Sequence, residues 1–135
     1  MSDVVVTVPK SFRWDGSDER GLAAWIDEGD AAGDPYSGIL WKFSTWGARP
    51  EIAPAERVYV VCEGRVRGFA PLVELRFSLV QNGLGRVVFV RGDGAEAVTI
   101  PHRTTGFRGW RYRWWHRDIE VAFPNWKTAD REVRE

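Results

Sequence analysis

The hydrophobic pattern of the chain predicts a succession of short strands with one early helix. Two runs rich in Val, Phe and Leu, residues 57–62 and 65–75, flank the dipeptide Glu63-Gly64. A two-residue connection that contains Gly, placed between two such runs, is typical of a tight antiparallel hairpin. Gly68 and Pro71 interrupt the second run and predict a bulge or bend there, since Pro cannot donate to a ladder. A strand bent in this way favours a barrel.

Residues 17–28 are predicted to form the early helix. Ser17 is a suitable N-cap, and apolar residues recur at helical spacing from Leu22 until Gly29, which is expected to end the helix. The acidic residues between Asp15 and Asp34 are then mostly its solvated outer face.

The remaining strands are predicted from shorter apolar runs. Val and Ile runs around Gly92-Asp93-Gly94 predict a second hairpin. The runs that predict strands outside the first hairpin are residues 3–8, 36–46, 86–91, 95–100 and 119–123. The pattern predicts an α+β, mainly β fold: a small barrel of about five to seven strands with the helix packed against it.

The length of 135 residues predicts a single domain, residues 1–127, with a frayed tail at 128–135. The single Cys62 excludes an internal disulfide and a cysteine-based zinc site. No apolar run is as long as a membrane span, so no membrane is expected, and a cytoplasmic location is predicted. His102 and His116 lie fourteen residues apart with no acidic residue at ligand spacing, so no metal is expected, and no cofactor is expected either.

Charge is balanced overall but uneven along the chain. The formal net charge is zero, yet residues 101–117 contain five Arg, two His and no acidic residue. A neutral domain argues against indiscriminate binding to duplex nucleic acid, whereas a local basic surface remains compatible with a single strand.

Residues 107–117 interleave arginine with aromatic side chains. Guanidinium groups hold phosphates, and aromatic faces stack on unpaired bases, so this segment predicts a nucleic-acid site. Cation–π pairs that pin the last strand to the barrel, or an interface with an acidic protein, are the alternatives. The predicted binding residues, with two tryptophans of an earlier strand that would help to sandwich a base, are Trp41, Trp46, Arg108, Trp110, Arg111, Tyr112, Arg113, Trp114 and Arg117.

Four stretches together resemble the PUA-like superfamily, and most nearly the layout of ASCH domains and the related EVE domains. They are LAAWIDEG (22–29), GILWKFST (38–45), the proline-containing approach 49–54, and RVYVVCEGRVRGFAPL (57–72). The resemblance implies a β-barrel with a cleft that is used on RNA, nucleotides or modified bases.

The ASCH pattern Gly-x-Lys-x-x-Glu-x-Arg is absent after the helix, where Asp30-Ala31-Ala32 follows Gly29. Only Lys42 and Glu74 lie roughly where small ASCH hydrolases place catalytic groups. The favoured hypothesis is therefore a module that binds single-stranded RNA, a nucleotide or a modified base. The alternative is a nucleoside amidohydrolase or ribonuclease that uses Lys42 and Glu74 as proton carriers.

Overall fold

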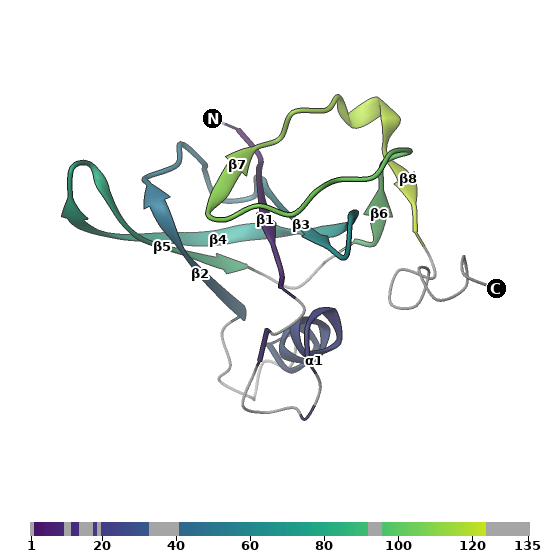
Figure 1. Cartoon of the computed structure of the whole chain (residues 1–135), viewed down its shortest axis with the longest axis horizontal. Helices are drawn as coiled ribbons and strands as arrows, with labels where there is room; N and C mark the ends of the chain where they lie inside the picture. Colours follow the sequence, from purple (N-terminus) through teal and green to yellow (C-terminus); the bar gives the residue numbers. More distant parts are fainter. Residues whose placement is uncertain are drawn as a thin grey trace.

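The computed structural model describes residues 2–9, 12–13, 18, 20–32, 41–91 and 96–123 (Figure 1). Within these residues the fold is mainly β, with one α-helix, as the hydrophobic pattern predicts. In chain order the elements are β1 (Val4–Thr7), α1 (Leu22–Ala32), β2 (Trp41–Ala48), β3 (Arg57–Cys62), β4 (Arg65–Gln81), β5 (Leu84–Arg91), β6 (Val98–Thr99), β7 (Trp110–Tyr112), the 3-10 helix η1 (Arg117–Ile119) and β8 (Val121–Ala122).

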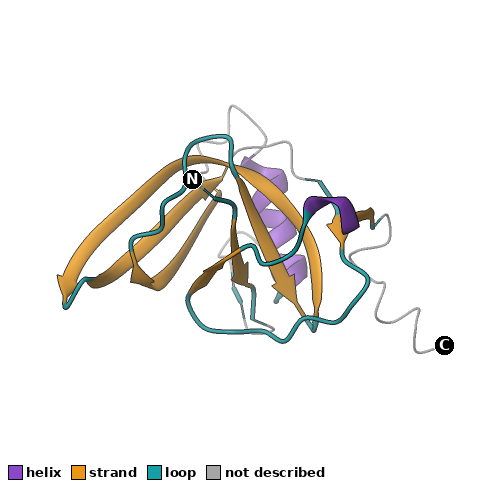
Figure 2. Cartoon of the chain, turned by 90° about the horizontal axis from the view of Figure 1, so that it is seen from above, coloured by secondary structure: helices purple, strands orange, loops and turns teal. Residues whose placement is uncertain are grey.

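Six of these strands form one curled sheet in the order β2-β5-β4-β3-β1-β7. β1 runs parallel to β3, and the other neighbours are antiparallel. The short strands β6 and β8 pair separately. Figure 2 shows the helix behind the curled sheet, with the β4–β5 hairpin projecting to the left.

The predicted hairpin between β3 and β4 is confirmed. Glu63 and Gly64 form its turn with positive φ values of 51° and 80°. The ladder shifts next to Gly68, the position that predicts a bulge. A Cβ on Gly68 would lie 2.4 Å from the carbonyl oxygen of Glu96, so only glycine lets these two backbones meet.

The predicted second hairpin, between residues 86–91 and 95–100, is wrong. β5 pairs with β4 on one side and β2 on the other, whereas β6 pairs with β8. Asn82 and Gly83 connect β4 to β5 with φ values of 52° and 75°. Positive φ at both residues matches the twist of a two-residue hairpin, and this turn sets the partner of β5.

Helix α1 packs on the face of the sheet that carries Phe43 and Phe89, here called the inner face. Trp25 and Ile26 are buried against that face, so the predicted packing of the helix on the sheet is confirmed. This inner core consists of Val4, Val6, Val8, Trp25, Ile26, Phe43, Ile52, Val58, Val60, Cys62, Ala70, Leu72, Val87 and Phe89.

The helix begins and ends later than predicted. It starts at Leu22, not at 17, and it continues through Gly29 to Ala32. A glycine inside a helix costs only about 1 kcal/mol relative to alanine, and alanines at 31 and 32 favour continuation. Burial of the apolar face of the helix therefore stabilises it by more than Gly29 destabilises it.

Residues 96–123 cover part of the opposite, outer face. Val5, Tyr59, Val61, Val66, Phe69, Ile100 and Trp115 form this outer core. The coverage extends over β1, β3 and the first half of β4, while the outer face of β2, β5 and the second half of β4 carries exposed side chains. The predicted last strand is shorter than residues 119–123, because η1 occupies its start.

Several predicted features lie outside the described residues. They are the N-cap Ser17, the start of the strand predicted at 36–46, the turn at 92–94 and the tail at 128–135.

Candidate nucleic-acid interface

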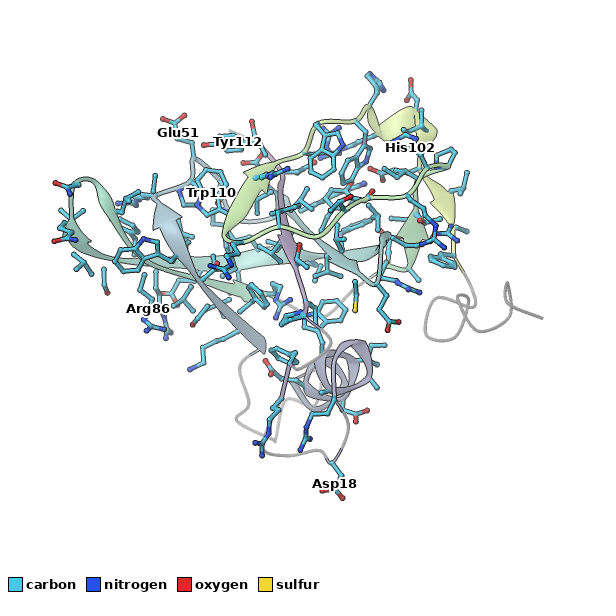
Figure 3. All side chains as sticks on the ribbon, in the orientation of Figure 1. Asp18, Glu51, Arg86, His102, Trp110 and Tyr112 are labelled. Carbon is cyan, nitrogen blue, oxygen red and sulfur yellow. The ribbon has the colours of Figure 1, made fainter. Side chains whose placement is uncertain are left out.

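β7 meets the far edge of the sheet at β2, and side chains close the seam between them. The indole Nε1 of Trp110 donates a hydrogen bond to the Ala48 carbonyl oxygen at 2.8 Å. The Tyr112 hydroxyl accepts a hydrogen bond from the Glu51 N–H at 3.0 Å, and Figure 3 shows these side chains together. The rings of Trp110 and Tyr112 touch edge to face at 4.7 Å. Both predicted binding residues therefore draw the curled sheet together.

Two glycines let the backbones approach at this seam. A Cβ on Gly47 would lie 3.1 Å from Nε1 of Trp110. A Cβ on Gly109 would lie 3.0 Å from the carbonyl oxygen of Trp46, and Gly109 has a φ of 75° that glycine tolerates. Trp46 and the residues just before β7 are consequently neighbours.

The side chains of Trp46 and Trp110 nevertheless point to opposite faces. Trp110 lies opposite Val6 and packs against the inner core. Trp46 lies opposite Arg86 and is 49% exposed. Figure 3 shows Arg86 and Trp110 on opposite sides of the β4–β5 ribbons. The sequence predicts a base held between Trp41 or Trp46 on one side and Trp110 or Trp114 on the other. Of these combinations, the pair Trp46 and Trp110 would require one ring to change face.

A cluster of rings and cations lies on the outer side of β7. The guanidinium carbon of Arg111 is 4.4 Å from the centroid of the Phe107 ring. The Phe107 ring meets Trp114 at 6.1 Å, and Trp114 meets Trp115 at 5.0 Å, both edge to face. Trp115 is buried in the outer core, whereas Trp114 is 49% exposed. Trp114 thus presents aromatic surface close to a cation.

The seam connects this cluster to the outer face of β2 and β5. Arg108 precedes Gly109, which packs on the backbone of Trp46, and Trp46 pairs across strands with Arg86. The sequence does not single out Arg86, because its place beside Trp46 depends on strand register. We call the combined set the Arg–Trp surface; it consists of Trp46, Arg86, Phe107, Arg108, Arg111 and Trp114.

The three arginines of the Arg–Trp surface are exposed. In the described part of the chain, none of the three forms an ion pair with an acidic side chain. Their charge is therefore available to a ligand.

Arg113 and Arg117 have a different role from the one predicted. Arg113 Nε lies 3.0 Å and Arg117 Nη2 lies 2.7 Å from Oδ2 of Asp3, which is buried. The N–H of Arg57 donates to the other oxygen at 2.9 Å. Burial opposes ionisation of Asp3, but the Arg57 N–H and the Arg117 and Arg113 guanidinium groups hold its pKa below the usual value of 3.8. These two arginines are thereby committed to an internal carboxylate.

Two further buried charges, Glu28 on helix α1 and Arg91 on β5, interact electrostatically and carry no sequence signal. Both residues are buried, and Glu28 also accepts a hydrogen bond from the Lys42 N–H at 3.1 Å. Burial raises the pKa of Glu28. Burial lowers the pKa of Arg91 to about 9, so this guanidinium, 5.1 Å from the Trp25 ring, stays charged at neutral pH.

The predicted catalytic residues Lys42 and Glu74 lie in one row of the outer face, on either side of Val90. Both are exposed, and the Glu74 carboxylate is 3.0 Å from Arg76. Cα atoms two strands apart are about 10 Å from each other. A lysine that transfers protons at neutral pH needs a desolvated position, which the exposed Lys42 lacks.

A groove of about 620 Å³ lies between the segment 49–54 and β4. Its lining is mostly apolar, with Arg49, Glu51 and Glu74 as its charged residues. It belongs to neither the Arg–Trp surface nor the buried charge pairs.

Among the described residues no group of three or more His, Cys, Asp or Glu is placed to hold a metal ion. None of the helices in the described ranges is long and apolar enough to cross a membrane. Trp41 begins β2, but its side chain lies outside the described part of the structure.

Comparisons of the chain with protein-family models, with curated proteins and with solved structures found no match.

Proposed function

We propose that this domain binds single-stranded RNA on the Arg–Trp surface. The observation that carries the proposal is the exposure of Trp114, whose ring contacts the Phe107 ring over which Arg111 lies. Arg111 has no acidic partner in the described residues. Stacking of one base on an aromatic ring contributes about 1–3 kcal/mol. A guanidinium group nearby can hold the adjoining phosphate.

Two exposed tryptophans at separate points favour a strand over a single nucleotide. Trp46 and Trp114 belong to β2 and to the segment after β7, and the seam at Gly109 joins their surroundings. Each ring can accept one unstacked base. Arg108, which precedes Gly109 at the seam, can contact the phosphate backbone of the RNA. A free nucleotide would occupy only one of these positions.

The charge distribution favours a single strand over a duplex. The net charge of the chain is zero, and Arg113 and Arg117 both bind Asp3, whose single negative charge offsets one of their two positive charges. Duplex binding without sequence preference draws on many phosphate contacts and a strongly basic domain. A few cations with accessible rings instead suit unpaired bases, which leave their faces open to stacking.

The PUA-like resemblance of the sequence is consistent with this proposal but does not supply its residues. The cleft expected from that family would lie between barrel and helix, whereas the Arg–Trp surface lies on the outer face. The hydrolase alternative remains a prediction from Lys42 and Glu74 alone.

Titration of a fluorescently labelled RNA single strand, followed by anisotropy at several salt concentrations, tests the proposal. Three arginine–phosphate contacts predict a slope of log K against log salt of roughly −2, since each contact on a single strand contributes about −0.7. The double variant Arg108→Gln/Arg111→Gln should flatten the slope by about 1.4. Arg13→Gln, an exposed arginine near the helix, is the matched control.

The absence of binding by the unchanged protein would contradict the proposal. So would an unchanged slope in the double variant. Equal affinity for a duplex of the same sequence would show that stacking on unpaired bases is not the mode of recognition.

A further inference from the structure

The hairpin formed by β4 and β5 projects beyond the rest of the sheet and has an apolar tip. From Glu74 to Gln81, β4 pairs with β5 alone in the described part of the chain. Figures 1 and 2 show this hairpin extending to the left, past the other strands. At its end Leu79 is 66% exposed, Val80 62% and Leu84 39%; we call these three residues the hairpin tip. Exposed apolar side chains that gather in one place mark an interaction site.

The strands behind the hairpin tip contain cations and no acidic residue. In residues 41–50 and 75–91 the charged residues are Lys42, Arg49, Arg76, Arg86 and Arg91. Of these, Lys42, Arg76 and Arg86 are exposed on the outer face, where Glu74 offsets one charge by binding Arg76 at 3.0 Å. The outer face behind the tip is therefore positively charged. This combination suits a ligand that has both an apolar face and anionic groups.

The hairpin tip adjoins the Arg–Trp surface. Leu84 lies opposite Ala48, and Trp46 is two residues before Ala48 on the same face of β2. Trp46 and Leu84 are therefore diagonal neighbours, with Cα atoms about 7–8 Å apart, a separation that large side chains bridge. A nucleotide whose base stacks on Trp46 consequently has its neighbour in the RNA chain beside the tip.

A duplex end provides the apolar face that the hairpin tip requires. Along an RNA duplex the grooves present base edges, hydroxyl groups and phosphates, and the faces of the inner base pairs are covered by stacking. Only the last base pair has an open face. Leucine and similar side chains contact base faces where a duplex is opened. An apolar tip in front of a cationic surface therefore fits the end of a duplex better than its groove.

The turn at the end of the hairpin argues against a lipid surface as the ligand. Gln81, Asn82 and Gly83 are exposed there, beyond the apolar side chains of the tip. In hydrocarbon their amide and backbone groups would lose their hydrogen bonds to water, which is strongly unfavourable. Beside RNA the same amides can donate to and accept from base edges and 2′-hydroxyl groups.

We infer that the hairpin tip stacks on the last base pair of an RNA stem whose unpaired tail continues onto the Arg–Trp surface. This inference rests on the proposed function and specifies its RNA, a single strand that leaves a duplex. Trp46 takes the first unpaired base. Arg76 and Arg86 contact phosphates near the junction, and the tail then runs towards Trp114.

Competition anisotropy with three RNAs and the unchanged protein tests this inference. The RNAs are a single strand, the same strand joined to an open stem, and the same strand as a flap at a nick, where a second duplex covers the last base pair. Tails at the 5′ and at the 3′ end are compared. The better of the two open tailed stems should bind about tenfold more tightly than the single strand, as burial of one leucine-sized side chain predicts. The flap should bind like the single strand.

A variant of the hairpin tip separates contact with the stem from contact with the tail. Leu79→Ser/Val80→Ser/Leu84→Ser should bind the single strand as the unchanged protein does, which also shows that it is folded. It should bind the open tailed stem no more tightly than the single strand. Val121→Ser, which changes a 52% exposed residue of β8, is the matched control and should keep the preference.

The failure of this inference differs from the failure of the proposed function. If the unchanged protein binds all three RNAs equally, or if the tip variant keeps the preference, the inference is overturned and the proposed function stands. Absence of binding to the single strand contradicts both. Co-sedimentation with vesicles of phosphatidylcholine and phosphatidylserine that the tip variant loses would assign the tip to a lipid surface and overturn the inference.

Discussion

The indole N–H of Trp110 donates to the carbonyl oxygen of Ala48 across a seam that no backbone ladder spans. Together with Tyr112, this side chain holds β2 and β7, the two edge strands of the curled sheet, against each other. It also places Arg108 and Gly109 beside Trp46, so the geometry of the Arg–Trp surface depends on it.

Trp110→Phe is expected to lower the free energy of unfolding by about 0.5–1.5 kcal/mol, because it removes this hydrogen bond and keeps most of the ring. Chemical denaturation followed by circular dichroism measures the change. Tyr112→Phe, which removes the acceptor of the Glu51 N–H, should have an effect of the same order. Full stability in Trp110→Phe would show that the seam is held by packing alone.

The buried carboxylate of Asp3 predicts a specific loss of stability in acid. Its pKa in the folded chain is below the usual 3.8, so the folded state binds this proton less readily than the unfolded state. The stability that ionised Asp3 contributes is therefore complete above pH 3.8 and is lost as the pH falls through the lowered pKa.

Asp3→Asn is expected to lower the free energy of unfolding at neutral pH by about 1.5–3 kcal/mol, because it weakens hydrogen bonds to a charged group. Its stability should also change less steeply than that of the unchanged protein below pH 3.8. Denaturant midpoints at a series of acidic pH values measure both effects. Parallel curves for the two proteins would assign the acid sensitivity to another carboxylate.

The mainly β fold, the β3–β4 hairpin and the packing of the helix follow from local signals. The turn at Glu63-Gly64 and the bulge at Gly68 depend only on residues that are close in sequence. The buried face of the helix, with Trp25 and Ile26, depends only on the helical spacing of apolar residues. The site is different. Asp3 is more than 100 residues from Arg113, and no local pattern indicates that it binds two of the five arginines of residues 101–117.

Strand register explains the other differences between sequence and structure. Trp46 and Trp110 are neighbours at the seam, but whether their rings face each other depends on which residue lies opposite Arg86 and which lies opposite Val6. A shift by one residue would exchange the faces. The sequence therefore indicates the residue types of the surface without indicating which of them share a face.

Arg111 and Arg113 are a matched pair that separates binding from structure. Arg111→Gln should reduce the salt slope of RNA binding by about 0.7 and leave stability almost unchanged, because this side chain is exposed. Arg113→Gln should lower stability by about 1.5–3 kcal/mol through the loss of its bond to Asp3, with little change of slope. Equal effects of the two variants on the slope would contradict the assignment of Arg113 to Asp3.

The adjacent residues Trp114 and Trp115 offer the most direct test of base stacking. Their rings meet edge to face at 5.0 Å, yet Trp114 is 49% exposed and Trp115 only 6%. The Nε1–H of Trp115 also donates a hydrogen bond to the Glu120 carboxylate at 2.9 Å. Trp115 is therefore fixed both by packing in the outer core and by a hydrogen bond. The same substitution at the two positions should thus have different consequences.

Trp114→Ala is expected to lower the affinity for single-stranded RNA by about 1–3 kcal/mol without altering the salt slope, because stacking of two π-faces releases no counterion. Trp115→Ala should instead lower the free energy of unfolding by about 3–5 kcal/mol, as the loss of a large buried side chain does. Anisotropy titrations and denaturant unfolding of both variants measure these changes. If Trp114→Ala loses stability in the same way as Trp115→Ala and retains its affinity per folded molecule, the exposed ring is part of the core and not a platform for a base.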